Sequence, residues 1–188
     1  VDEAQDYDPL HYEILGLLFP NAKYTVLGDV NQSIEKQADV SLYDEVERIL
    51  HKKRTTKVFL TKSFRCSYEI NAFSAHILGQ ELEIESFDRH ESAPLVVHKE
   101  STRQLDDAVV QEIQRCMTSG LESAAVVCKN MRQARKLYEG IGQRLGARLL
   151  DETADAVMSG IVIAPVYMVK GLEFDAVVVY EAGAQSYS

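Results

Sequence analysis

Two adjacent carboxylates near the start of the chain have the chemistry that nucleotide hydrolysis needs. Asp2 and Glu3 lie in the string Val1-Asp2-Glu3-Ala4-Gln5-Asp6. At the carboxyl end of a buried strand, such a pair would face the ligand crevice of an open α/β sheet. One carboxylate can then hold hydrated Mg²⁺, while its neighbour orients or deprotonates the attacking water. A solvated acidic pair at a chain terminus is the alternative interpretation.

Three further segments carry polar residues that suit the same chemistry. Residues 27–34 read Leu-Gly-Asp-Val-Asn-Gln-Ser-Ile, and residues 63–70 place Arg65 between a strand and a helix start. Residues 169–175 read Val-Lys-Gly-Leu-Glu-Phe-Asp and lead into an apolar strand. Taken singly, these segments are also typical of a turn, a surface charge and a helix end.

Together and in this order, the segments resemble the motor domains of superfamily 1 helicases of the UvrD/Rep type. Residues 1–6 are similar to motif II, the Walker B sequence, and residues 28–34 to motif III. Phe64-Arg65 is similar to motif IV and residues 170–174 to motif V. The resemblance spans nearly the whole chain. It implies an enzyme that hydrolyses ATP between two RecA-like domains in order to move on single-stranded DNA.

The resemblance implies a role for each matching residue of the first three motifs. Asp2 would bind Mg²⁺ through the water shell of the ion, and Glu3 would be the catalytic base. Gln32 would sense the γ-phosphate of ATP and couple hydrolysis to domain movement. Arg65 would reach the same phosphate as an arginine finger, which neutralises developing charge.

Motif V implies a second group of contacts. Glu173 would accept a hydrogen bond from the nucleotide ribose, and Gly171 would allow the backbone to approach closely. Tyr167 and Lys170 are weaker candidates for nucleic-acid contact, since a tyrosine can stack on a base. The implied cofactors are ATP and Mg²⁺.

Other parts of such a motor are missing from the sequence. No Gly-x-x-x-x-Gly-Lys-Ser/Thr string occurs, and no arginine-bearing motif VI follows motif V. We therefore expect a carboxyl-side piece of a longer protein, inactive without the remainder of its parent chain. Residues 1–50 would be the C-terminal part of a first RecA-like domain, and residues 51–188 most of a second.

Some departures from the family pattern argue against strand unwinding more than against ATP hydrolysis. Glu35 replaces a usual aromatic, Pro165 replaces the threonine of a usual Thr-x-His, and no long insertion separates motifs IV and V. These features resemble the HelD-type helicase-like ATPases, which bind and recycle RNA polymerase and share the Tyr-Met-x-Lys-Gly-Leu-Glu-Phe-Asp string of residues 167–175. Single-stranded DNA and RNA polymerase are therefore alternative partners. A non-catalytic remnant is the third interpretation.

Composition limits the possible classes of protein. The chain has 188 residues and a net charge of −9, which excludes a broadly cationic nucleic-acid binder. The three cysteines and five histidines lack metal-ligand spacing, so a zinc site is not expected. No apolar run is long enough to span a membrane and no signal peptide is visible, which favours a cytoplasmic protein. The resemblance implies that this protein is of bacterial type.

Alternating strands and helices must position these residues. The alternation predicts an α/β fold with a mainly parallel sheet flanked by helices, and the resemblance implies that this fold is RecA-like. We expect strands at 24–27, 58–60, 95–97, 124–128, 161–163 and 176–179. We expect a helix capped by Asp8 with an apolar core stripe at Leu10, Ile14, Leu17 and Leu18, and later helices capped by Ser41, Ser67 and Asn130.

Overall fold

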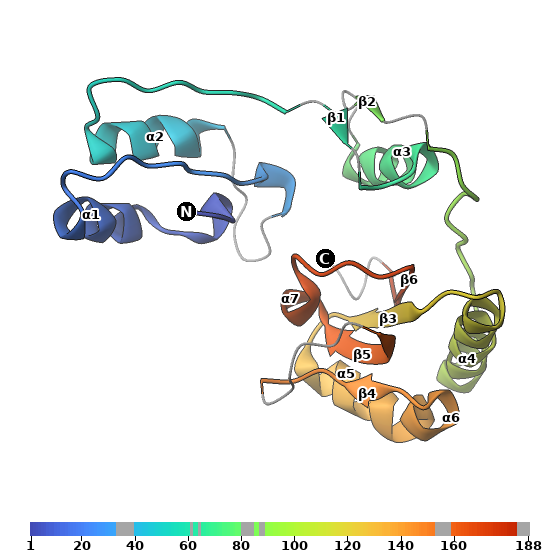
Figure 1. Cartoon of the computed structure of the whole chain (residues 1–188). Coiled ribbons are helices and arrows are strands. Elements are labelled where there is room, and N and C mark those ends of the chain that lie inside the picture. Colours follow the sequence, from blue (N-terminus) through green and yellow to red (C-terminus); the bar gives the residue numbers. More distant parts are fainter. Residues whose placement is uncertain are drawn as a thin grey trace. The chain divides into compact units, whose positions relative to one another are not determined.

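Both β-sheets that the structure describes are built from parallel strands (Figure 1). The structure is a computed structural model, and it describes residues 1–32, 40–60, 62–63, 65–79, 85–86, 89–152 and 159–183. Contacts divide the chain into two compact units, Val1–Leu95 and Val96–Ser188. The expected division into residues 1–50 of a first RecA-like domain and residues 51–188 of a second stays a prediction.

The larger sheet belongs to the second unit and has the strand order β4-β5-β3-β6. Its inner strand β3 (Ser123–Cys128) lies between β5 (Gly160–Pro165) and β6 (Ala176–Val179). The short strand β4 (Arg148–Leu149) pairs with the other side of β5. The three strands expected in this part of the chain are therefore confirmed, as is the α/β class with a parallel sheet.

Helices cover both faces of this sheet, because the strands are apolar on both sides. The side chains of residues 124, 126 and 128 pack in one cluster with α4 (Thr102–Thr118) and α5 (Met131–Leu137). The π-helical segment Tyr138–Gly142 and α6 (Gln143–Leu145) contribute to the same cluster. Residues 125 and 127 pack on the other face, where α7 (Val166–Val169) lies. Strand β3 is therefore buried on both faces.

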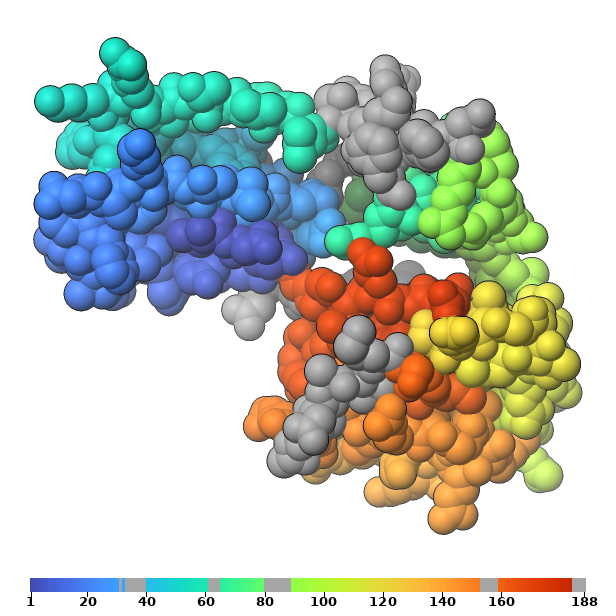
Figure 2. All heavy atoms as spheres, in the orientation of Figure 1, coloured from blue at the N-terminus to red at the C-terminus, as the bar shows by residue number. Residues whose placement is uncertain are grey.

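Two helices of the first unit pack against each other, α1 (Pro9–Leu18) and α2 (Ser41–Leu50). Their blue and cyan atoms are visible in Figure 2. Asp8 is the N-cap of α1 and proline its first residue, as expected. The N-cap of α2 is Val40, so the expected cap Ser41 is the first residue inside that helix.

The remaining elements of the first unit are one strand before Arg65 in the sequence and a helix and a strand after it. The strand β1 (Lys62–Ser63) pairs in parallel with β2 (Glu85–Ser86). Helix α3 (Tyr68–Leu78) begins after Ser67, whose Oγ accepts a hydrogen bond from the backbone N–H of Ile70 at 3.4 Å. The expected caps Ser67 and Asn130 are both confirmed, since Asn130 Oδ1 accepts from the N–H of Gln133 at 3.0 Å.

Two expectations about apolar residues are wrong. The predicted core stripe of α1 (Leu10, Ile14, Leu17 and Leu18) is exposed, and the fully buried side chain of that helix is Tyr12. Residues 58–60 and 95–97 are not strands, and Leu60 is 87% exposed. Apolar spacing shows that a segment can be buried, but burial also needs a hydrogen-bonded or packed neighbour. No helix in the described part of the chain is long and apolar enough to cross a bilayer.

Candidate functional site

The start of the chain pairs with the segment that precedes Gly28. The amino group of Val1 donates to the carbonyl oxygen of Thr25 at 2.8 Å, and the N–H of Leu27 donates to the Val1 carbonyl at 2.9 Å. This is how a residue pairs with a neighbouring parallel strand. The N–H of Ala4 then donates to the Leu27 carbonyl at 2.8 Å. The expected strand before Gly28 is therefore an extended segment whose end lies beside Val1.

Gly28 allows this close approach. A Cβ atom at position 28 would lie 2.4 Å from Gln5 Oε1, 2.9 Å from the backbone nitrogen of Ala4 and 2.9 Å from the Tyr43 hydroxyl. Burial, followed by the charge of Asp29, raises the pKa of Tyr43. The space at this turn is thus filled by the Gln5 amide and by α2, and a side chain at position 28 does not fit.

Hydrogen bonds connect the expected base to the expected phosphate sensor. Gln5 Nε2 donates to Glu3 Oε2 at 2.6 Å, and Gln5 Oε1 accepts the N–H of Asp29 at 3.1 Å. Asp29 Oδ2 accepts a hydrogen bond from Gln32 Nε2 at 2.8 Å. The structure therefore brings Glu3 and Gln32 into one hydrogen-bonded chain. The Gln5 amide lies at its centre.

The backbone of Glu3 is strained. Its φ of 51° and ψ of 46° place it in the left-handed region. For a residue other than glycine, such a conformation costs about 1–3 kcal/mol, and it is found mainly at functional sites. Ala4 and Gln5, which follow directly, are both buried. The packing of these two residues holds Glu3 in the strained conformation.

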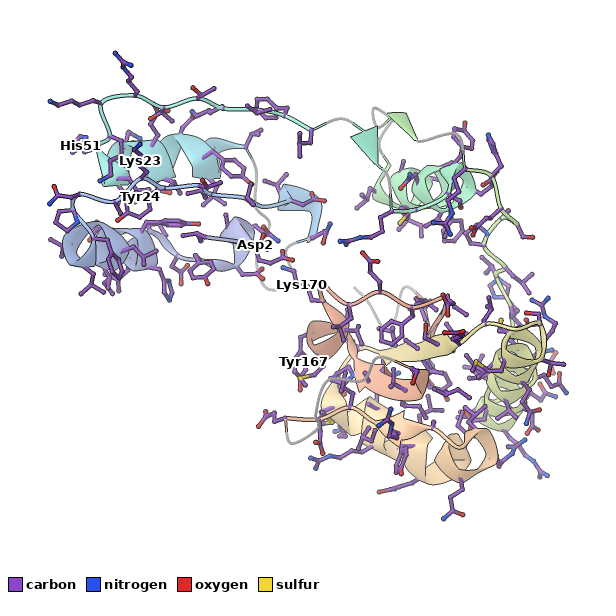
Figure 3. All side chains as sticks on the ribbon, in the orientation of Figure 1. Asp2, Lys23, Tyr24, His51, Tyr167 and Lys170 are labelled. Carbon is purple, nitrogen blue, oxygen red and sulfur yellow. The ribbon has the colours of Figure 1, made fainter. Side chains whose placement is uncertain are left out.

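Asp2 has the donor atoms that a magnesium ion requires. Its carboxylate is exposed, and its Oδ1 accepts the N–H of Glu3 at 2.9 Å (Figure 3). Mg²⁺ bound with a nucleotide keeps several waters and uses one or two carboxylates together with phosphate oxygens. Within the described ranges, no three His, Cys, Asp or Glu side chains are grouped so that they could hold a metal ion. One exposed carboxylate fits Mg²⁺ that is bound mainly by phosphate and water.

Arg65 is exposed in the turn between β1 and the N-cap of α3. Its carbonyl oxygen accepts a hydrogen bond from Arg89 Nη1 at 3.2 Å, and the carbonyl of Arg89 accepts the N–H of Tyr68 at 3.0 Å. The backbone around the expected arginine finger is therefore held from a distant part of the chain. The motif residues Ser33, Ile34 and Phe64 lie outside the described residues, as does Glu35, which follows motif III.

Residues 89–91, which we call the strap, bind the start of α3. Glu69 accepts the N–H of Glu91 at 2.9 Å, and its other oxygen contacts His90 Nδ1 at 2.8 Å. The Glu91 N–H, followed by the His90 ring, lowers the pKa of the Glu69 carboxyl to about 2. Sequence reasoning missed this contact, because no local pattern connects residues that lie 21 and 22 positions apart.

The expected motif V residues belong to the second unit. Tyr167 lies on α7 and is 47% exposed, and Lys170 follows at the end of that helix (Figure 3). Gly171 has a φ of 77°, and a Cβ there would meet no atom within 4 Å. Glycine is thus favoured at position 171 by backbone conformation, and the space beside it is open. Glu173 is exposed.

Asp175 and Pro165 have structural roles at the two ends of motif V. Asp175 Oδ2 accepts hydrogen bonds from the Ser123 hydroxyl and N–H, both at 2.9 Å, and from the Glu122 N–H at 3.0 Å. These bonds, the Ser123 hydroxyl first, lower the pKa of Asp175. Pro165 is buried at the end of β5, where it pairs with Cys128 of β3. Asp175 directly follows motif V in the sequence, but no local pattern indicated its hydrogen-bond partners.

The expected site residues thus lie in both units, and hydrogen bonds join Glu3 to Gln32 within the first unit. A hollow on α5 contains none of them; it is lined by Met131, Arg132, Arg135, Lys136 and Glu139. Comparisons of the chain with models of protein families and with curated proteins found no significant match.

Proposed function

We propose that the chain is part of a superfamily 1 motor ATPase that hydrolyses ATP to move on single-stranded DNA. The observation that carries this proposal is the hydrogen-bonded chain that joins Glu3 to Gln32 beside two parallel segment ends. In open parallel α/β folds, ligands bind outside the carboxyl ends of the strands. We propose a RecA-like fold for the second unit on the same resemblance, which its parallel sheet supports.

Each polar group of the site has a distinct proposed task. Glu3 takes the proton of the attacking water, and the hydrogen bond from Gln5 to its Oε2 orients the carboxylate for that task. Asp2 holds Mg²⁺, which supplies charge for the phosphates when it is bound. Arg65 neutralises charge that develops on the γ-phosphate. Glu173 of the second unit accepts a hydrogen bond from the ribose.

The decisive experiment is the substitution Glu3→Gln in the complete natural polypeptide that contains this sequence. Loss of the base should lower the kcat of ATP hydrolysis about 100-fold or more, while nucleotide binding remains. Glu13→Gln, an exposed carboxylate on α1, is the matched control and should leave turnover unchanged. Glu3 is not the base if Glu3→Gln retains normal turnover.

Movement on DNA needs separate evidence. Single-stranded DNA should accelerate ATP hydrolysis, and DNA binding should weaken steeply as salt is raised, because phosphate contacts release counterions. Tyr167→Ala should reduce the acceleration, since the exposed ring can stack on a base. A hydrolysis rate that does not respond to DNA would contradict this part of the proposal.

RNA polymerase is the second candidate partner. The buried Pro165 presents no hydroxyl where the DNA helicases usually have a threonine, and the net charge of −9 disfavours a strand-gripping surface. For this candidate, the complete polypeptide should retain RNA polymerase from a cell extract, and Tyr167→Ala should not reduce that capture. Absence of polymerase from the captured proteins would count against it.

Absence of any Glu3-dependent turnover would favour the non-catalytic remnant.

A further inference from the structure

Gln5 is a buried polar residue whose burial needs an explanation. Of the polar and charged side chains in the described residues, Gln5 at 5% exposure and Ser67 at 1% are the buried ones. Ser67 caps α3, so its burial has a structural reason. Burying an amide is costly unless its hydrogen bonds are made within the protein. In Gln5 the amide nitrogen and the amide oxygen each have a partner.

The partners of Gln5 determine which chemical group can stand there. A carboxylate oxygen of Glu3 only accepts a hydrogen bond, and the N–H of Asp29 only donates one. The orientation of the Gln5 amide follows from these two partners. A carboxylate at position 5 would keep the bond from Asp29 but would repel Glu3, and a methionine would keep the length of the side chain but neither bond. Only a carboxamide joins both.

The turn at position 28 leaves space for this amide. The missing Cβ of Gly28 would lie 2.4 Å from Gln5 Oε1, closer than any side chain can approach. Tyr12 holds the neighbouring backbone, because its hydroxyl donates to the carbonyl oxygen of Ala4 at 2.9 Å. The Gln5 amide is therefore held in place by packing as well as by its own hydrogen bonds.

We infer that Gln5 is a positioning residue that couples the orientation of Glu3 to the position of Gln32. The inference rests on the proposed ATP hydrolysis and adds a residue to it. Gln32 is exposed and donates to Asp29, whose N–H donates in turn to the buried Gln5 amide. A displacement of Gln32 changes these bonds, and the orientation of Glu3 responds through the same amide.

The first test is a pair of substitutions in the complete polypeptide. Gln5→Met and Gln5→Glu should each lower the kcat of ATP hydrolysis about 100-fold, because a misplaced catalytic group loses that much. The KM for ATP should change less than about threefold, since Gln5 itself contacts no nucleotide in the proposed site. Gln111→Met, an exposed glutamine on α4, is the matched control and should leave both constants unchanged. Unchanged kcat in Gln5→Met would overturn the inference.

A double-mutant cycle tests the coupling itself, which a merely structural role would not produce. If Gln5 and Gln32 act through one hydrogen-bonded chain, the kcat of the double variant Gln5→Met with Gln32→Leu should be no more than about twofold below that of the less active single variant. If they act independently, the losses in kcat multiply, and the coupling is wrong.

A charge swap separates the structural part from the catalytic part. In the variant Glu3→Gln with Gln5→Glu, the amide at position 3 can donate to the carboxylate at position 5, which still accepts from Asp29. Hydrogen exchange of the Asp29 N–H should therefore be slow in the swap variant and faster in Gln5→Met. Fast exchange in the swap variant would show that Gln5 does not hold Asp29 as inferred.

The outcomes separate the inference from the proposed function. If Glu3→Gln abolishes turnover while the losses of Gln5→Met and Gln32→Leu multiply, the inference is wrong and the proposed function stands. If the complete polypeptide hydrolyses no ATP, the proposed function fails. If Glu3→Gln leaves turnover unchanged, Glu3 is not the base, and the inference fails with that assignment. Turnover that depends on Glu3, together with non-multiplying losses, supports both.

Discussion

At the turn that contains Gly28, the Gln5 amide and the backbone of Ala4 lie close to the glycine. At this turn the N–H of Asp29 donates to the Gln5 amide oxygen, and the N–H of Ala4 donates to the carbonyl oxygen of Leu27. Sequence alone marked Gly28 as part of a motif, but an ordinary turn would explain a glycine equally well. The short distances to a missing Cβ show that position 28 is restricted by space.

The substitution Gly28→Ala should therefore destabilise the first unit. The added methyl group would overlap Gln5 and the Ala4 backbone, and overpacking of this kind costs about 1–3 kcal/mol in the free energy of unfolding. Urea denaturation measures the change. The control is Gly16→Ala within α1, where the nearest side-chain atom lies 3.8 Å away. That change should stabilise the helix by about 0.5–1 kcal/mol, and equal effects of both substitutions would contradict the packing at Gly28.

Asp175 predicts a pH dependence of the second unit. Hydrogen bonds from Ser123 and Glu122 lower its pKa below the ordinary 3.8 in the folded state. A lowered folded-state pKa contributes stability that is present above the ordinary pKa and is lost as pH falls through the folded-state value. When the free energy of unfolding is measured as a function of pH, it should therefore decrease less at low pH in Asp175→Asn than in the unchanged protein. An identical acid-side loss in both proteins would exclude this role for Asp175.

At the scale of elements, hydrogen bonds join the strap to the first turn of α3 and to the backbone of Arg65. The strap reaches the helix at its N-cap end, where Ser67 already accepts a backbone N–H and Glu69 lies in the first turn. Arg89 extends the same contact to the carbonyl oxygen of Arg65. These bonds hold the backbone of Arg65, the residue that we propose as a phosphate ligand, in position.

Glu69→Gln should loosen the strap. The Glu69 carboxyl, with a pKa lowered from 4.5 to about 2, binds the Glu91 N–H best while it is ionised. The contact should therefore be complete above pH 4.5 and weaken as pH falls toward 2. Hydrogen exchange at the Glu91 N–H reports the contact, and Glu69→Gln should accelerate that exchange. The control Glu112→Gln removes an ion pair with Arg115 on α4 and should not accelerate the exchange of the Glu91 N–H.

The apolar segments 58–60 and 95–97 show that apolar composition alone does not predict a β-strand. Both have strand-like composition, and neither is a strand in the structure. A strand needs a partner for its backbone N–H and C=O groups, and composition does not supply that partner. Strands β3, β5 and β6 of the larger sheet were predicted correctly from their continuous apolar runs, whereas the two-residue strand β4 was not predicted.

At the scale of the whole molecule, the core is unevenly divided between the two units. Most buried apolar residues lie in the second unit, on β3, β5 and the helices that cover them. In the first unit, the buried apolar residues described are Ala4, Tyr12 and Val46. Since burial of apolar surface is the main stabilising contribution, the second unit should resist unfolding better than the first.

Limited proteolysis tests this difference. Chymotrypsin should cleave at exposed sites such as Phe59, Leu60 and Leu95. A fragment that begins after Leu95 should then persist, because its sheet and helices share one core. Mass spectrometry identifies the surviving fragment. Persistence of residues 1–95 with loss of the second unit would contradict the unequal stability of the two units.

The sequence by itself determined the α/β class, strands β3, β5 and β6 of the larger sheet, the caps of α1, α3 and α5, and the types of the candidate residues. These properties depend on neighbours along the chain, such as apolar runs and capping side chains. Only the tertiary structure decided that Tyr12 is the buried side chain of α1, that residues 89–91 bind α3, and that Gln5 joins Glu3 to Asp29. Each of these depends on residues far apart in the chain, and no local pattern specifies which distant groups come within hydrogen-bonding distance.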